Sequence, residues 1–246
     1  MSAGRFVWRE LVVASPAASF YASLFGWSTK SVPMGDMTYT LFRHATLDED
    51  VGGSVAPQMK DVPPFWLDYI TVDDLDRAAA TIARLGGKVL SPTIDAPGVG
   101  RFFIAADPAG AVFAPFLSAT PGATPDRNPP VGTFCWSQLM TSNLDRSVPF
   151  YCEVFGWTPM PTGPMTVFAQ GEHQRASAAP YPDAPMPDMW LKYVAVSNCD
   201  ASWESALKLG AAPIKAPTDI PGLGRFAVLA DPTGAVFALW THTGSM

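Results

Sequence analysis

Charged side chains are scarce in this sequence. Asp, Glu, Lys and Arg make up 15% of its 246 residues, against about a quarter in an average globular protein. The formal net charge is −6 and no run of Lys or Arg occurs, which argues against binding to a nucleic-acid backbone. No apolar run approaches the roughly 20 residues that a membrane-spanning helix needs. We therefore expect a compact protein with neither a nucleic-acid nor a membrane partner.

Cysteine is also rare, and its arrangement excludes two kinds of site. Cys135, Cys152 and Cys199 are the only three, and no two of them form a CxxC pair. An odd number without such pairs argues against a disulfide framework and against a cysteine zinc site. The first residues show no signal-peptide pattern. A reducing cytoplasm is therefore the expected location.

A long internal repeat dominates what is present. Segment 66–116 aligns with segment 190–240 without a gap. Three motifs occur in both copies: FYxx(L/V)FGW at 20–27 and 150–157, PGxGRF at 97–102 and 221–226, and DPxGAVFA at 107–114 and 231–238. This repetition predicts two like domains, 1–117 and 132–246, joined by a proline-rich linker over 118–131.

Each copy also divides into two similar halves. In the first copy, strand 6–13 precedes a helix over about 16–25, and strand 65–72 precedes a helix over about 75–85. Further strand-like segments follow the helices at 37–42, 51–56, 88–90, 101–106 and 112–117. The pattern predicts four strand–helix–strand–strand–strand units and an α+β fold.

The predicted helices carry recognisable end signals. Ser15 is a suitable N-cap and Pro16 suits the first helical position. Asp73 or Asp74 caps the second helix, and Gly86 stands where a left-handed C-cap is needed.

The FYxxLFGW helix, the Val-Asp-Asp-Leu-Asp turn at 72–76 and the DPxG hairpin resemble those of the vicinal oxygen chelate superfamily. Within it, the chain is most similar to the tandem two-domain glyoxalase/bleomycin resistance protein group. The resemblance implies tandem glyoxalase/bleomycin-resistance/dioxygenase-like domains, whose four βαβββ modules form two curved open barrels around cavities. It also implies a fused dimer with pseudo-twofold symmetry, as a monomer or a weak homodimer.

The superfamily's chemistry usually uses a divalent metal held by His, Gln or Glu on strand positions that face the cavity. Counting from the motifs that match the family places these positions at non-ligating side chains in both copies: Trp8, Leu67 and Ala114, and Trp136, Leu191 and Ala238. Indole, isobutyl and methyl groups do not coordinate such cations. We therefore expect no metal and no other cofactor.

Strand alternation then predicts which side chains line the cavities. The expected ligand-binding set is mainly apolar and aromatic, as in small-molecule pockets. It comprises Trp8, Glu10, Tyr39, Leu67, Tyr69, Arg101, Ala114, Phe116, Trp136, Gln138, Tyr193, Arg225 and Trp240. Two alternatives stay open. The side chains could fill the barrels completely, and the two arginines could either orient an anion at the cavity mouth or fix their own turns.

Glu10 is the candidate catalytic residue. Its counterpart in the second copy is Gln138, so the two cavities would differ in charge. A desolvated carboxylate could act as a general acid or base, bind a ligand, or form an ion pair.

Three functions follow from these patterns. The first is a metal-free protein that holds a hydrophobic or aromatic small molecule, in a resistance or sequestration role. The second is an enzyme that uses the same cavity, either by acid/base catalysis through Glu10 or as a metal-dependent lyase, isomerase or dioxygenase. The third is an interaction protein with filled barrels.

Overall fold

The computed structural model describes residues 3–14, 17–34, 37–58, 60–120, 129–181 and 186–242. These residues form two compact units, and each unit contains parts of both sequence copies. Unit 1 consists of Met1–Trp8, Leu67–Arg127 and Ser137–Trp190, and unit 2 of Arg9–Trp66, Asn128–Trp136 and Leu191–Met246. The copies and the compact units are therefore different divisions of the chain. Ser15, Pro16 and most of the expected linker lie outside the described residues.

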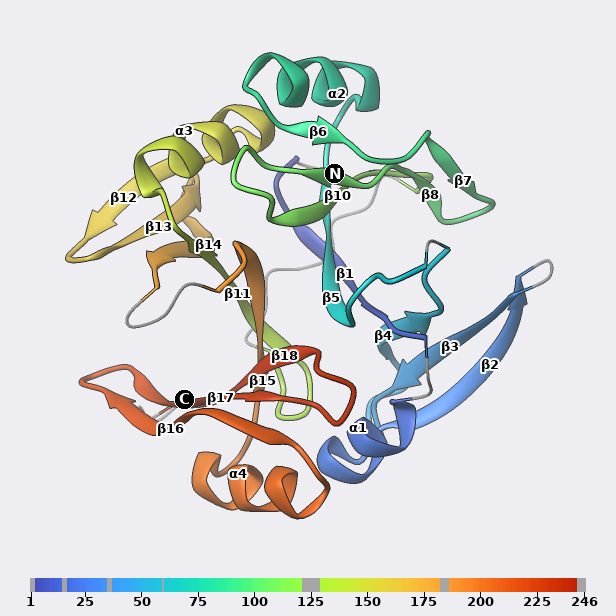
Figure 1. Cartoon of the computed structure of the whole chain (residues 1–246), viewed down its shortest axis with the longest axis vertical. Coiled ribbons are helices and arrows are strands. Elements are labelled where there is room, and N and C mark those ends of the chain that lie inside the picture. Colours follow the sequence, from blue (N-terminus) through green and yellow to red (C-terminus); the bar gives the residue numbers. More distant parts are fainter. Residues whose placement is uncertain are drawn as a thin grey trace. The chain divides into compact units, whose positions relative to one another are not determined.

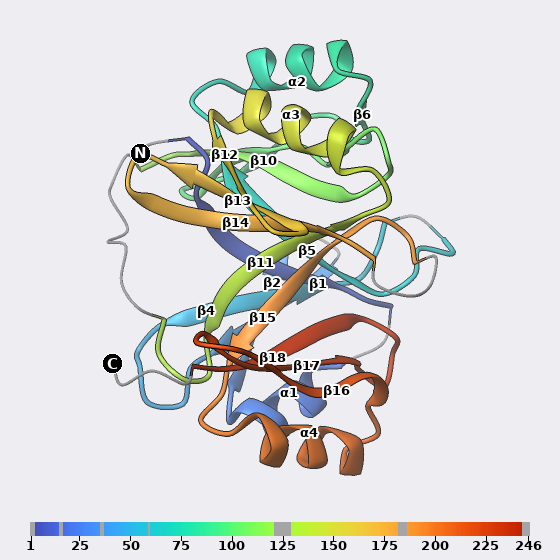
Figure 2. The same ribbon diagram turned by 90° about the vertical axis from the view of Figure 1, so that its left-hand side faces the viewer.

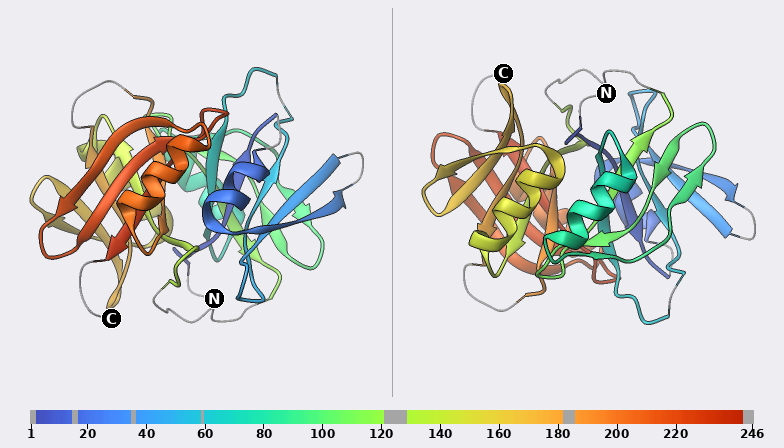
Figure 3. Two further views of the ribbon diagram at one scale, coloured as in Figure 1. Left: turned by 90° about the horizontal axis from the view of Figure 1, so that it is seen from below. Right: turned by 90° about the horizontal axis from the view of Figure 1, so that it is seen from above.

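Unit 1 joins the second half of copy 1 to the first half of copy 2. The half from copy 1 has strand order β5-β10-β8-β7, with β6 and β9 paired beside it. Its elements are β5 (Phe65–Thr71), α2 (Leu75–Arg84), β6 (Lys88–Val89), β7 (Ile94–Ala96), β8 (Gly100–Phe102), β9 (Ala105–Ala106) and β10 (Val112–Ser118). The half from copy 2 has order β12-β13-β14-β11. It comprises β11 (Phe134–Thr141), α3 (Leu144–Phe155), β12 (Thr158–Thr162), β13 (Met165–Gln170) and β14 (His173–Pro180). Helices α2 and α3 lie side by side (Figure 3, right).

Unit 2 joins the remaining two halves. A few strands cross the boundary between the units, so their end residues belong to the other unit. The half from copy 1 has strand order β2-β3-β4-β1. Its elements are β1 (Phe6–Val12), α1 (Ala18–Phe25), β2 (Ser28–Met34), β3 (Met37–Arg43) and β4 (Asp50–Val55). The half from copy 2 has order β15-β18-β17-β16. It comprises β15 (Met189–Ala195), α4 (Cys199–Lys208), β16 (Ala212–Ile220), β17 (Gly224–Ala230) and β18 (Val236–His242). Here α1 and α4 are neighbours (Figure 3, left, and Figure 2).

The four halves therefore follow the predicted strand–helix–strand–strand–strand order (Figure 1). Strand β2 is one that the sequence pattern did not name. In the second half of copy 1, the two hairpin strands are each broken in two, as β6 and β7 and as β8 and β9.

Each helix packs on one face of its sheet, and this face forms the core. In unit 1 the core includes Ile70, Phe103 and Phe113 from copy 1, together with Phe150 and Tyr151 of α3. Phe113 makes edge contacts with Phe150 and Tyr151, at ring-centroid distances of 6.0 and 5.4 Å. Burying such rings removes apolar surface from water, which stabilises the fold by roughly 25 cal/mol for each Å² buried. We call the opposite side of each sheet, which faces away from its helix, the inner face.

The predicted end signals agree with the structure where it describes them. The Asp74 side chain accepts a hydrogen bond from the Arg77 backbone N–H at 2.9 Å, as an N-cap does. Gly86 has φ of 83°, a left-handed conformation that costs glycine little.

No helix in the described part of the chain is long and apolar enough to cross a membrane.

Candidate functional site

Three aromatic rings from three neighbouring strands pack together on the inner face of unit 1. Tyr69 of β5 lies edge-on to Phe102 of β8 at 4.9 Å and to Phe116 of β10 at 6.2 Å between ring centroids. Phe116 pairs with Phe102 across the strands, and Ala114 pairs with Tyr69. The residues between them, Ile70 and Phe103 among others, belong to the helix-side core. We call Tyr69, Phe102 and Phe116 the first aromatic wall.

Unit 2 carries the equivalent group, which we call the second aromatic wall. Tyr193 of β15 lies 6.3 Å from Phe226 of β17 and 6.5 Å from Trp240 of β18. Ala238 pairs with Tyr193, as Ala114 does with Tyr69. Burial raises the pKa of the Tyr193 phenol, so this hydroxyl stays protonated at neutral pH.

In each wall, one aromatic ring packs directly against the backbone of a glycine in the neighbouring hairpin. A Cβ atom at Gly100 would lie 2.6 Å from the Phe116 ring, and one at Gly224 would lie 2.5 Å from the Trp240 ring. The second glycine of each PGxGRF motif is therefore required by ring packing against the backbone, which is a structural role.

The six positions that the resemblance assigns to metal ligands carry side chains that do not fit a metal. Ala114 and Ala238 lie beside the wall tyrosines with no exposed surface, and Leu67 and Leu191 are also buried. Trp8 and Trp136 are half-buried on β1 and β11. Among the residues that the structure describes, no three His, Cys, Asp or Glu side chains form a group that could hold a metal ion.

Glu10 lies on β1 at the point where that strand pairs with Gly53 of β4. Leu11 and Val13 belong to the core beneath α1, so alternation directs Glu10 to the inner face. A Cβ atom at Gly53 would lie 2.1 Å from the Tyr39 hydroxyl oxygen. The Tyr39 ring therefore occupies the space that a side chain at position 53 would need, on the strand beside Glu10.

The equivalent place in copy 2 is neutral. Gln138 pairs with Ser177 in the same register, and its Nε2 atom donates to the Met165 sulfur at 3.4 Å. Glu10, next to the glycine that Tyr39 covers, is thus replaced in copy 2 by Gln138, whose amide contacts the Met165 sulfur.

The two arginines of the PGxGRF motifs lie on the other side of their strands from Phe102 and Phe226. Arg225 donates from Nε and Nη2 to Asp200 at 2.8 Å each, and from Nη1 to Asp219 at 2.9 Å. These bonds lower the pKa of Asp200. Arg101 is exposed. The structure thus places neither guanidinium with its aromatic wall.

The cysteines and the described histidine contacts indicate no nucleophile–base arrangement. Burial raises the pKa of Cys135 to about 12 and that of Cys152 and Cys199 to about 11, so the thiols are protonated at neutral pH. His44 accepts backbone N–H bonds at Nδ1 from Thr46 and Leu47. It caps a turn.

Motif residues that define the repeat meet in the core and not on the inner face. The Tyr21 hydroxyl donates to Asp231 at 2.8 Å and accepts from the Trp66 indole N–H at 2.9 Å. In unit 1 the Trp190 indole donates to the Tyr151 hydroxyl at 3.0 Å. These buried contacts explain why the motifs recur in both copies without assigning them a chemical role.

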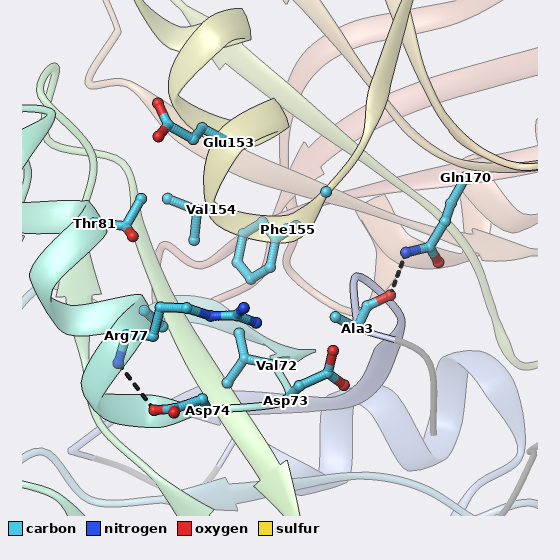
Figure 4. Close-up of a pocket in the computed structure, with 12 residues that line it drawn as sticks. Ala3, Val72, Asp73, Asp74, Arg77, Thr81, Glu153, Val154, Phe155 and Gln170 are labelled. Atoms are coloured by element: carbon cyan, nitrogen blue, oxygen red, sulfur yellow. Dashed lines mark hydrogen bonds between the residues drawn. The ribbon is translucent and has the colours of Figure 1, made fainter.

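A groove of about 530 Å³ lies beside α2 and α3 in unit 1 (Figure 4). Val72, Ala78 and Phe155 form its apolar part, and the Arg77 guanidinium extends into it. Glu153, at its edge, forms an ion pair with Arg84. The groove is on the helix side of unit 1, so it is separate from the first aromatic wall.

Sequence reasoning found Tyr69, Phe116, Tyr193 and Trp240 but not the other two members of the walls, Phe102 and Phe226. It also missed Gly53 and Met165. The alternation that places Arg101 outside places Phe102 inside, so the signal was present in the PGxGRF motif itself.

The chain belongs to the Glyoxalase/Bleomycin resistance protein/Dioxygenase superfamily, whose model matches residues 13–114 and 133–239. It is 34% identical over 237 residues to "Putative glyoxylase CFP32" of Mycobacterium tuberculosis, covering 92% of this chain and 89% of that protein. It is 30% identical over 265 residues to "Anthracycline biosynthesis protein DnrV" of Streptomyces peucetius, covering 96% and 92%.

Solved structures share the fold. The Mn(II)-bound glyoxalase from Novosphingobium aromaticivorans matches 98% of this chain and 82% of its own, with a TM-score of 0.63 and 19% identity. The 2,3-dioxygenase LapB from Pseudomonas sp. KL28 matches 100% and 94%, with a TM-score of 0.62 and 15% identity. The predicted α+β class with tandem glyoxalase-fold domains is therefore confirmed.

Proposed function

We propose that this protein binds an aromatic small molecule on the inner faces of its sheets without a metal ion. The observation that carries the proposal is the pair of aromatic walls, which occupy the same register in both copies. Flat aromatic rings bind other rings by offset or edge-on stacking, at about 0.5–1.5 kcal/mol per pair beyond area burial. The non-ligating residues at all six family metal positions support the same function. The name of the relative from Streptomyces peucetius adds support, because anthracyclines are fused-ring aromatic compounds.

A binding titration tests the proposal. Anthraquinone-2-sulfonate, a soluble fused-ring probe, is expected to quench tryptophan fluorescence saturably, and Tyr69→Ala is expected to weaken its binding about fivefold or more. Arg77→Ala, in the helix-side groove, is the matched control and should leave the affinity unchanged. Loss of binding with Arg77→Ala but not with Tyr69→Ala would place the probe in the groove and contradict the proposal.

Metal content is tested separately. Elemental analysis of protein purified without chelators is expected to find no stoichiometric zinc, nickel, manganese or iron. About one tightly held metal ion per copy would contradict metal-free binding.

Glu10 supports a second candidate function, metal-free acid/base catalysis or recognition of a cationic ligand. Glu10 pairs with Gly53, which the Tyr39 phenol covers, and its equivalent in copy 2 is the neutral Gln138. Glu10→Gln should then weaken the cationic ring compound 9-aminoacridine by about 1–3 kcal/mol, the usual magnitude for a charged hydrogen bond, and leave anthraquinone-2-sulfonate binding unchanged. A loss of several kcal/mol of folding stability without loss of affinity would show that Glu10 belongs to a structural ion pair.

A further inference from the structure

The two aromatic walls are completed by edge hairpins of different construction. In copy 2, β16 and β17 are each one unbroken strand, although their pairing shifts register at Pro213/Lys215 and at Lys215/Thr218, and β17 pairs with β18 from Gly224↔His242 to Ala230↔Val236. In copy 1 the equivalent hairpin pairs only at Ile94↔Phe102, Asp95↔Arg101 and Ala96↔Gly100, and the ladder stops there. It resumes as a separate short pair, β6 with β9. The first hairpin, residues 94–102, therefore lacks a continuous ladder toward β6 and β9. It is held by the pairing of β8 with β10 and by the Ala119 N–H, which donates to the Val99 carbonyl at 3.0 Å.

A proline explains the break. Pro115 in the middle of β10 is the repeat equivalent of Leu239, which pairs with Ala227 in copy 2. Pro has no backbone N–H, so it cannot donate to the neighbouring strand. The remaining bond at this point, from the Phe103 N–H to the Pro115 carbonyl, is long at 3.4 Å. The ladder of copy 1 is therefore interrupted next to Phe102.

In copy 2, ion pairs fasten the hairpin to its helix, and we call them the latch. The equivalent residues of copy 1 form no such ion pairs. Arg225 ties strand β17 to Asp200 in the first turn of α4 and to Asp219 on β16. The repeat equivalents in copy 1 are Arg101, Asp76 and Asp95. All three are described, and no ion pair joins them. A guanidinium that binds one carboxylate through two nitrogens holds a fixed geometry, so only the second hairpin is fastened to its helix.

We infer that hairpin 94–102 is a lid on the first aromatic wall, and that the first wall admits the ligand in preference to the second. The lid carries Phe102 onto Tyr69 and Phe116, whose exposed fractions are only 5% and 8%. It opens by separation of β8 from the end of β10, which also breaks the bond from the Ala119 N–H to the Val99 carbonyl, with the buried Phe103 as its fixed end. The exposed Val99 lies at its tip. The lid follows from the hairpins alone, whereas the preference for the first wall rests on the proposed function.

Hydrogen exchange on the full chain without any ligand tests the lid. Segments 94–102 and 218–226 are matched, because each contains the same three strand pairs and the same PGxGRF turn. Local openings expose amides in proportion to their equilibrium population. We expect the protection factors of 94–102 to be about tenfold lower than those of 218–226. Equal protection, or better protection of 94–102, would overturn the lid.

Two variants with opposite effects sharpen this test. Pro115→Ala supplies the missing N–H and should slow exchange in 94–102. Arg225→Gln removes the latch and should speed exchange in 218–226, whereas Arg101→Gln, which breaks no ion pair, should change nothing in 94–102. If Pro115→Ala fails to fold, the two arginine variants still decide: no change with Arg225→Gln would overturn the latch and with it the inference.

A ligand arm separates the lid from the proposed function. With anthraquinone-2-sulfonate bound, protection should rise in 94–102 before it rises in 218–226 along the titration. Protection of 218–226 alone would overturn the preference for the first wall and leave the proposed function supported. No protection of either segment, with the ligand-free difference intact, would contradict the proposed function and leave the lid supported.

Discussion

At the scale of single residues, equivalent positions in the repeat have different energetics. The Oδ1 atoms of Asp107 and Asp231 both accept backbone N–H groups of their DPxG turns. Asp231 Oδ2 also accepts the Tyr21 hydroxyl, but Asp107 Oδ2 is buried with no hydrogen-bond partner among the described residues. Identical motifs therefore do not predict identical contributions to stability, because a second element decides whether the last polar atom is satisfied.

The first prediction follows from this difference. Burial raises the pKa of Asp107, so the folded protein holds a proton there more tightly than the unfolded chain does. The ionised carboxylate therefore costs stability at neutral pH, and this cost disappears as the pH falls through the folded-state pKa. Asp107→Asn should leave the free energy of unfolding at pH 7 unchanged or raise it by up to about 1 kcal/mol.

Urea unfolding at pH 7 and at acidic pH measures this effect. Asp231→Asn is the matched control and should lose about 1–3 kcal/mol, because its bond from Tyr21 is broken. A larger loss for Asp107→Asn than for Asp231→Asn would contradict the assignment.

The second prediction concerns Gly53. A methyl group there would meet the Tyr39 ring, so Gly53→Ala should destabilise the fold by about 1–3 kcal/mol, as overpacking does. The double variant Gly53→Ala with Tyr39→Ala should be more stable than the sum of the two single effects predicts, and a double-mutant cycle in urea measures this coupling. Additive effects would show that Tyr39 does not lie over Gly53.

At the scale of secondary-structure elements, the sequence predicted the helices and most strands, because periodicity and capping residues are local. The α2 helix was expected over 75–85 and is found at Leu75–Arg84. Strand β2 and the broken hairpin of copy 1 escaped prediction. The break depends on the N–H that Pro115 lacks toward a strand distant in sequence, which no local pattern reveals.

The candidate site was predicted to the extent that strand alternation could be anchored. Tyr69 and Phe116 lie on long strands next to clear motifs, and both were identified. Phe102 follows a tight glycine turn, where a shift of one residue moves every side chain to the opposite face. Arg101 was expected at the site because an arginine follows this turn in both copies, and it is exposed.

The third prediction belongs to the contact that joins α1, β5 and the turn before β18. Tyr21→Phe leaves both Asp231 Oδ2 and the Trp66 indole without their partner. Tyr151→Phe removes the partner of the Trp190 indole and the weaker electrostatic contact between Tyr151 and Asp107. We expect Tyr21→Phe to be more destabilising than Tyr151→Phe, by about 1–2 kcal/mol, which thermal and urea unfolding can measure. Equal losses would indicate that Asp107 is also satisfied by its tyrosine.

At the scale of the whole molecule, neither sequence copy forms a hydrophobic core by itself. The core of unit 2 contains Tyr21 and Phe42 from copy 1 together with Phe237 and Leu239 from copy 2. The core of unit 1 likewise combines Phe113 from copy 1 with residues of copy 2. Each core is therefore built from residues of both copies.

The last prediction follows from this arrangement. A fragment of residues 1–120 retains α1 and α2 but lacks the rings that pack against them, and a fragment of residues 129–246 has the converse defect. Each fragment alone would expose a large apolar face, which favours self-association or incomplete folding. Mixed in equal amounts, the two should form a one-to-one complex with the circular dichroism and tryptophan fluorescence of the intact chain, as light scattering after size-exclusion chromatography can verify. If fragment 1–120 were a stable, fully folded monomer, the cores could not be shared between copies in solution. The intact chain would then be two independent domains, and the Tyr21–Asp231 bond between the copies would contribute nothing measurable to stability.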